Sequence, residues 1–197
     1  MPPTDFAFDA LAATYDAQFT DSRIGTLMRQ AVWQRLDACF HPGQRILELN
    51  CGTGADAVYL GQYGVRVLAT DLSPAMVQIT RQKVARAGLT AMVQVQQLAL
   101  ENIAALKTAP FDGALSNFGG LNCVADLAGV GRALGVGLVP LPRCSRDRLS
   151  PSAAQRCGMA WPDHPLSIDW HPATRLLTCF PATSGQCPRG SSTATVC

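Results

Sequence analysis

The stretch ILELNCGTGADA, residues 46–57, decides the fold, because it joins an apolar run to a glycine-rich turn. Residues 45–49 have the length and composition of a buried strand, and the glycines after them allow a tight turn. A Walker-type phosphate loop needs a Lys followed by Ser or Thr, and neither follows here. The turn therefore predicts a ligand other than the outer phosphates of a nucleotide.

Periodic apolar residues predict alternating strands and helices around this turn. Strands are predicted at 45–49, 65–71, 92–98, 111–118 and, as a beginning only, 136–139; helices are predicted at 8–19, 24–39, 57–63, 74–87 and 124–134, with a helical turn at 101–107. Ser73 followed by Pro74 favours a helix start, since the Ser oxygen caps a backbone N–H and Pro lacks one. The alternation predicts an α/β, Rossmann-like fold with a mostly parallel sheet and helices on both faces.

Ligands of such sheets bind beyond the carboxyl ends of the strands. The residues placed there are Asn50 to Gly54 after the first strand, Asp71 and Leu72 after the second, and Ser116 and Asn117 after the fourth. Glycines allow close backbone approach, the next helix presents free N–H groups, and Asp71 can accept hydrogen bonds from both ribose hydroxyls. We expect a crevice for an adenosine-containing molecule.

Two cofactors fit that outline. Residues 52–57, GTGADA, also satisfy the G-x-G-x-x-A variant of the dinucleotide fingerprint. In a dinucleotide site the glycines normally follow the strand directly, whereas here Glu48, Asn50 and Cys51 come first. Spacing alone therefore does not decide between a dinucleotide and another adenosine-containing cofactor.

Four segments resemble the class I S-adenosylmethionine-dependent methyltransferases in order and spacing. They are ELNCGTG at 48–54, VLATDLSPAMV at 67–77, FDGALSNFGGLNCV at 111–124 and the helical lead-in FDALAATYD at 8–16. The resemblance covers residues 6–139. It implies S-adenosylmethionine as the cofactor and direct methyl transfer to a small-molecule acceptor, with no nameable general base.

Carried over position by position, the resemblance implies a set of cofactor-binding residues. Glu48 would receive the amino group, Asp71 the ribose hydroxyls, and Tyr15 would cover the site. The full set is Tyr15, Glu48, Asn50, Gly52, Thr53, Gly54, Asp71, Leu72, Met76, Ser116 and Asn117. Simpler roles stay open: a plain tight turn for the glycines, a solvated carboxylate at Asp71 and a core aromatic at Tyr15.

The chain also departs from the family pattern. Asn50 stands where the commonest motif has its first Gly, which requires a negative φ or a left-handed Asn. The acidic residue near the adenine amine has no clear counterpart, because Glu101 and Asn102 lie at an uncertain register. Alternative functions are an NAD(P)-dependent oxidoreductase and a noncatalytic cofactor-binding protein.

Composition bounds the partners. A chain of 197 residues with 48% apolar content is typical of one globular domain, and the net charge of +2 is too small and scattered to indicate nucleic acid. The first ten residues lack the basic start of a leader, and no apolar run approaches the roughly 18 residues of a membrane span. We expect a cytoplasmic protein without membrane or nucleic-acid partners, and the oligomeric state is left open.

The composition changes sharply near residue 139. Residues 140–197 contain eight Pro, five Cys and six Arg but no Lys, Glu, Asn or Tyr. No C-x-x-C or H-x-x-x-H spacing supports a zinc site there. We predict a methyltransferase core at 1–139 and an aberrant, poorly ordered segment at 140–197 that leaves the sheet incomplete after strand five. The hypothesis that this segment is read out of frame is tested by translating the other two frames, which should yield a Gly-Gly turn and an apolar strand.

Overall fold

The computed structural model describes residues 8–138 together with the strands at 166–171 and 176–181. In chain order its elements are α1 (Asp9–Tyr15), a π-helical turn η1 (Asp16–Thr20), α2 (Arg23–Cys39), β1 (Arg45–Leu49), α3 (Ala55–Gln62), β2 (Arg66–Asp71), α4 (Pro74–Arg86), β3 (Val93–Gln97), the 3-10 helix η2 (Leu100–Ala105), β4 (Gly113–Ser116), the 3-10 helix η3 (Gly120–Cys123), α5 (Leu127–Gly137), β5 (Leu166–His171) and β6 (Leu176–Pro181).

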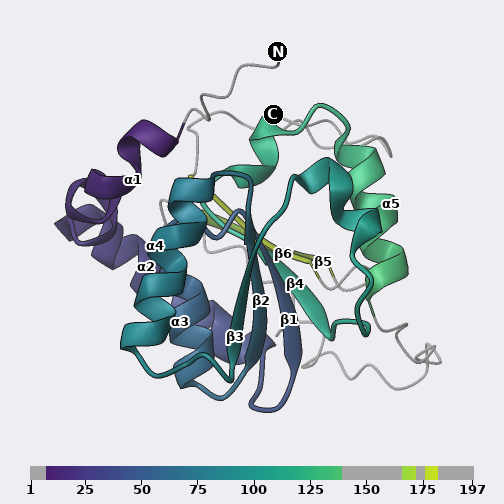
Figure 1. Ribbon diagram of the computed structural model, residues 1–197, viewed down its shortest axis with the longest axis horizontal. Coiled ribbons are helices and arrows are strands. Elements are labelled where there is room, and N and C mark those ends of the chain that lie inside the picture. The colour runs from purple at the N-terminus through teal and green to yellow at the C-terminus, as the bar shows by residue number, and fades with distance from the viewer. Residues whose placement is uncertain (1–7, 139–165, 172–175, 182–197) are drawn as a thin grey trace.

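The strands form one sheet in the order β3-β2-β1-β4-β6-β5. The pairings from β3 through to β6 are parallel, and β5 alone runs antiparallel to β6. Figure 1 shows α2, α3 and α4 on one side of this sheet and α5 on the other. The predicted fold class, α/β with a mostly parallel sheet and helices on both faces, is confirmed.

Alternation along β1 explains how the sheet is covered on both faces. Ile46 packs into one apolar core, which also contains Val32 and Leu36 of α2 and Leu60 of α3. Leu47 and Leu49 pack into the other, with side chains of η2 and α5. Successive strand residues face opposite sides, so Glu48 lies on the same face as Ile46. A carboxyl group is thereby placed within the sheet on the side of α2 and α3.

The predicted start of a fifth strand at 136–139 is wrong for the residues described. Helix α5 continues to Gly137, and Leu138 forms only an isolated parallel bridge with Phe111. Val130, Leu134 and Leu138 are buried at four-residue intervals, which is helical spacing. That apolar stripe outweighs the low helix propensity of the glycines between them.

The segment after residue 139 supplies two strands that the sequence did not predict. Strand β6 pairs with β4, and β5 lies at the edge of the sheet. The sheet thus continues past β4 despite the unusual composition. The remaining residues of that segment lie outside the described part of the chain, and the division at residue 139 stays a prediction. Among the described residues, no helix combines the length and apolar character needed to cross a membrane.

Candidate cofactor crevice and active site

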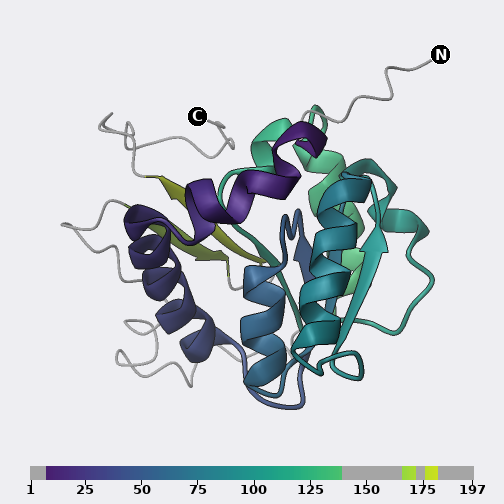
Figure 2. The same cartoon turned by 60° about the vertical axis from the view of Figure 1, so that its left-hand side comes forward.

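The sheet register brings the predicted site residues to one edge. Leu49, the last residue of β1, is paired with Thr70 of β2 on one side and Ser116 of β4 on the other. The loops that follow these three strands therefore emerge side by side. Figure 2 shows α1, in purple, crossing this end of the sheet.

The glycine loop has a left-handed backbone at three positions. Asn50 has φ 55°, Gly52 has φ 55° and Gly54 has φ 78°. Asn tolerates this region better than most residues with a side chain, and its Nδ2 donates to the carbonyl of Gly120 at 3.1 Å. The left-handed alternative considered for Asn50 is therefore the one observed.

Helix α4 fixes the loop through Thr80, which is fully buried. Its hydroxyl donates to the carbonyl oxygen of Gly52 at 2.8 Å. A Cβ at Gly54 would lie 2.4 Å from Thr80 Cγ2, whereas no described atom lies within 4 Å of a Cβ at Gly52. The two glycines thus serve different purposes: Gly54 allows packing against α4, and Gly52 leaves space open in the crevice.

We predict that Gly54→Ala lowers the free energy of unfolding by about 2 kcal/mol, from left-handed backbone strain and overpacking against Thr80. The matched variant Gly52→Ala has similar strain but no clash, and we expect about 1 kcal/mol. Urea unfolding of both variants measures the difference. Equal losses would contradict the assignment of separate purposes to the two glycines.

Asp71, at the end of β2, joins the glycine loop to the start of α4. Its Oδ2 accepts from the N–H of Gly52 at 2.8 Å and its Oδ1 from the N–H of Ser73 at 2.9 Å. Burial raises the pKa of Asp71, and these backbone hydrogen bonds only partly oppose that rise. The side chain is half-buried, so each oxygen keeps acceptor capacity for a ligand hydroxyl.

Glu48 is a buried acid, and the hydrogen bonds of the described residues do not satisfy both of its carboxyl oxygens. Its side chain belongs to a residue only 3% exposed, and Oε2 has no hydrogen-bond partner in the described part of the chain. Burial raises the pKa of Glu48 well above its ordinary value, and the nearby carboxylate of Asp56 raises it further. A donor from a ligand would satisfy this oxygen.

We predict that Glu48→Gln stabilises the free protein while weakening ligand binding. The pKa of Glu48 is raised in the folded state. At a pH between the ordinary glutamate pKa and this raised pKa, the folded protein keeps the proton while the unfolded chain releases it. Stability therefore falls as pH rises through this range. Gln removes this loss, and we expect a gain of about 1 kcal/mol at pH 8. Thermal unfolding from pH 5 to 8 measures it, and a stability loss in the variant at pH 8 would contradict the interpretation.

A second carboxylate, Asp56, organises the opposite side of the crevice. Its Oδ1 accepts from Arg29 Nη1 at 2.9 Å and from Trp33 Nε1 at 2.8 Å, and its Oδ2 accepts from Asn117 Nδ2 at 2.7 Å. Arg29, Asp56 and Asn117 are all less than one-tenth exposed. The guanidinium of Arg29 also lies 4.8 Å from the ring centre of Phe118. This network links α2, the first turn of α3 and the segment after β4.

The N-terminal elements are held over the crevice by two aspartates. Asp16 of η1 accepts from Thr53 of the glycine loop at 2.6 Å and pairs with Lys83 of α4 at 2.5 Å. Burial alone would raise the pKa of Asp16, but the hydrogen bonds from Lys83 and Thr53 outweigh it and the pKa is lowered. Asp9 of α1 accepts from the hydroxyl of Ser73. The helical lead-in, from which Tyr15 is expected to cover the site as a lid, therefore contacts both the glycine loop and α4.

Tyr15 is the last residue of α1 and so belongs to this lid. It is half-buried, and burial raises the pKa of its hydroxyl, with Arg29 opposing the rise and Asp56 adding to it. Its ring centre is 5.6 Å from that of Phe19. Phe19 in turn meets Phe118 edge-on at 5.3 Å. A partly exposed aromatic run thus borders the residues that follow β4.

Comparison with known proteins agrees with this geometry. The sequence profile of the methyltransferase domain family matches residues 46–134, from β1 into α5. These residues form a class I S-adenosylmethionine-dependent methyltransferase domain. The cofactor of this family is S-adenosylmethionine.

Two curated relatives share parts of the methyltransferase domain. A 75-residue stretch is 33% identical to the S-adenosyl-L-methionine-dependent Diels-Alderase of Talaromyces variabilis, covering 38% of this chain and 26% of that enzyme. A 79-residue stretch is 35% identical to the malonyl-[acyl-carrier protein] O-methyltransferase of Serratia marcescens, covering 39% of this chain and 28% of that enzyme. The chain thus matches little more than a quarter of the length of each.

A solved structure shows the same fold. It comes from Methanococcus maripaludis and is assigned to the S-adenosylmethionine-dependent methyltransferases. The two chains superpose with a TM-score of 0.59 at 18% identity, over 71% of this chain and 64% of the other. At that identity the likeness is one of fold alone.

The remaining predicted cofactor residues differ in how far they are exposed to a ligand. Leu72 is 49% exposed beside Asp71, whereas Met76 is only 2% exposed and offers little surface to a ligand. Ser116 is buried at the end of β4. Glu101 and Asn102 lie exposed in η2. Cofactor binding by each of these residues stays a prediction.

Four residues that shape the crevice were missed in the sequence: Arg29, Trp33, Asp56 and Thr80. Asp56 falls within the unspecified positions of the glycine motif, and its partners Arg29 and Trp33 come from α2. A charged residue on the inward face of a predicted amphipathic helix, as Arg29 is, was the available signal.

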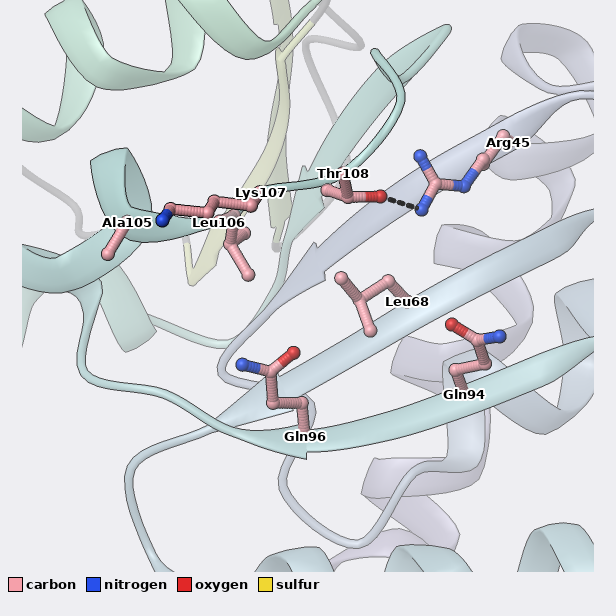
Figure 3. Close-up of a pocket in the computed structure, with 8 residues that line it drawn as sticks. All are labelled: Arg45, Leu68, Gln94, Gln96, Ala105, Leu106, Lys107 and Thr108. Atoms are coloured by element: carbon pink, nitrogen blue, oxygen red, sulfur yellow. Dashed lines mark hydrogen bonds between the residues drawn. The ribbon is translucent and has the colours of Figure 1, made fainter.

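A separate hollow of about 350 Å³ lies over the sheet near the start of β1. Figure 3 shows side chains from three strands and from the segment 105–108 around it, with Thr108 and Arg45 joined by a hydrogen bond. None of the predicted cofactor residues lines it. Because ligands of such sheets bind beyond the carboxyl ends of the strands, this hollow is not the cofactor site.

Proposed function

We propose that the chain is a methyltransferase that binds S-adenosylmethionine in this crevice and transfers its methyl group to a small-molecule acceptor. The observation that carries the proposal is a pair of buried acceptor atoms at the end of β1, Glu48 Oε2 and Asn50 Oδ1. Neither has a hydrogen-bond partner among the described residues. Two unpaired acceptors, one of them on the carboxyl group of Glu48, suit an ammonium group, which carries three donors and a positive charge.

The rest of the crevice fits the same molecule. Asp71 would hold the ribose hydroxyls, the exposed Leu72 would pack against the adenine, and the space beside Gly52 would take the methionine part. When bound, the cofactor would supply a sulfonium methyl group open to direct displacement by the acceptor. The chain's own residues contribute mainly by aligning the two reactants.

Charge favours this cofactor over a nicotinamide dinucleotide. Near the crevice, Arg29 is paired with Asp56 and Lys83 with Asp16. Glu48 and Asp71 have no salt bridge within the described residues and lie where the ligand would sit. A pyrophosphate would be repelled by the carboxylate of Asp71, whereas an ammonium group beside Glu48 would favour the ionised form of that acid and be attracted to it.

Calorimetric titration with S-adenosylhomocysteine tests the proposal, with NAD as the comparison. We expect micromolar binding of S-adenosylhomocysteine and none of NAD. Glu48→Gln should weaken the first about 10-fold, through loss of a charge-assisted hydrogen bond. Binding of NAD alone would assign the crevice to a dinucleotide and overturn the proposal.

A second candidate is a cofactor-dependent reaction without methyl transfer. The similarity to a Diels-Alderase that depends on S-adenosyl-L-methionine favours it. Release of S-adenosylhomocysteine from S-adenosylmethionine in the presence of an acceptor distinguishes the two, since only methyl transfer consumes the cofactor. The cytoplasmic location and the exclusion of nucleic acid stay predictions from the sequence.

A further inference from the structure

Asn117 presents a buried acceptor atom beside the crevice. Its residue is 8% exposed, and Oδ1 has no hydrogen-bond partner in the part of the chain that the structure describes. Asn117 directly follows Ser116, which pairs with Leu49 in the sheet, so it lies next to the end of β1. A buried amide oxygen without a donor costs free energy unless a ligand supplies one.

Asp56 determines which atom of Asn117 is presented. The carboxylate of Asp56, which pairs with Arg29, can only accept hydrogen bonds, so the Asn117 amide must turn its NH₂ group toward it. Arg29 and Trp33 occupy the other oxygen of Asp56 and hold the carboxylate in place. The orientation of the Asn117 amide therefore follows from charge, and its oxygen is directed away from Asp56.

The neighbouring surface is aromatic and strained. Phe118 has φ 53°, a left-handed conformation that is uncommon for a bulky residue. Such strain persists where surrounding contacts enforce it, and here Arg29 and Phe19 both pack on the Phe118 ring. A ring-bearing molecule beside Asn117 would meet this aromatic surface and a carboxylate-rich crevice.

We propose that Asn117 Oδ1 binds an N–H or O–H group of the methyl acceptor and that Asp56 is the positioning residue that sets this orientation. The inference rests on the proposed function and extends it to the acceptor, whose class is a neutral or cationic amine or alcohol. A carboxylate acceptor is disfavoured, because it would face the amide oxygen and the nearby acids without a donor.

The first test compares three small probes of one shape: benzylamine, benzyl alcohol and benzoate. Ligand-observed NMR is recorded on the full chain saturated with S-adenosylhomocysteine, whose binding is first established by calorimetry. We expect the amine and the alcohol to bind and benzoate not to bind. Asn117→Leu should weaken amine binding about 5-fold, as for loss of one hydrogen bond, while the exposed control Asn122→Leu leaves it unchanged.

The second test uses Asp56→Asn, which nearly preserves shape. The new amide oxygen would accept from Arg29 and Trp33, so its NH₂ group faces Asn117. The Asn117 amide then turns its oxygen to that donor and its NH₂ group to the ligand. We expect the probe preference to invert, with benzoate bound and benzylamine lost, an outcome that general loosening of the fold would not produce.

The outcomes separate the two proposals. Failure of S-adenosylhomocysteine to bind a folded sample would overturn the proposed function. Normal cofactor binding with equal or better binding of benzoate by the unsubstituted protein would overturn the assignment of Asn117 alone. So would an unchanged probe preference in a folded Asp56→Asn variant, or no binding of any probe to the cofactor complex.

Discussion

Replacing Asp71 with alanine should weaken binding of S-adenosylhomocysteine at least about 100-fold, because two kinds of contact disappear together. The carboxylate accepts from the backbone of Gly52 and Ser73, which joins the glycine loop to α4. In the proposed complex it also accepts from the ribose hydroxyls. Hydrogen bonds to charged groups contribute about 1.5–3 kcal/mol each, so loss of two exceeds 100-fold in affinity.

Calorimetry of Asp71→Ala, Asp71→Asn and a surface control measures this effect. Asn offers one acceptor oxygen instead of two, so we expect an intermediate loss. Asp21 is exposed at the end of η1, and Asp21→Ala should bind as tightly as the unsubstituted protein. If Asp71→Ala is folded and binds within 10-fold of the unsubstituted protein, Asp71 only braces the loop and the ribose lies elsewhere.

The sequence predicted the backbone of the glycine loop and the start of α4, because the determinants of both are local. The Ser73–Pro74 cap is observed, with the Ser73 hydroxyl accepting from the N–H of Met76. The glycine loop depends on φ values that only a few residue types adopt easily, so Gly52 and Gly54 can be recognised from the sequence alone. Asp71 follows from its place at the end of a strand.

The parts that escaped prediction depend on contacts between distant residues. Arg29 and Asp56 are 27 positions apart, and their pairing requires α2 to pack on α3. The residues around Leu138 had both strand-like and helical patterns, and only packing against η2 decides between them. The strands β5 and β6 escaped prediction because both are short and lie in a segment rich in Pro, which disfavours strands.

Replacing Arg29 with methionine should lower the free energy of unfolding by about 3–5 kcal/mol, the cost of leaving a buried charge without its partner. Arg29 donates to Asp56 at 2.9 Å, and both side chains are less than one-tenth exposed. Methionine keeps most of the length and the apolar contact with Phe118 but supplies no charge. Trp33 and Asn117 remain as neutral donors to Asp56 and cannot replace the guanidinium.

Urea unfolding of Arg29→Met measures this loss, with Arg132→Met as the matched control. Arg132 pairs with Asp126 at 3.5 Å, but both side chains are about two-thirds or more exposed. Exposed ion pairs contribute less than about 1 kcal/mol, so the control should be nearly neutral. Similar losses in the two variants would mean that Trp33 and Asn117 suffice to hold the Asp56 charge. In that case Arg29 would not be needed to fix the carboxylate that orients Asn117. The inverted probe preference expected for Asp56→Asn would then depend on Trp33 alone to orient residue 56.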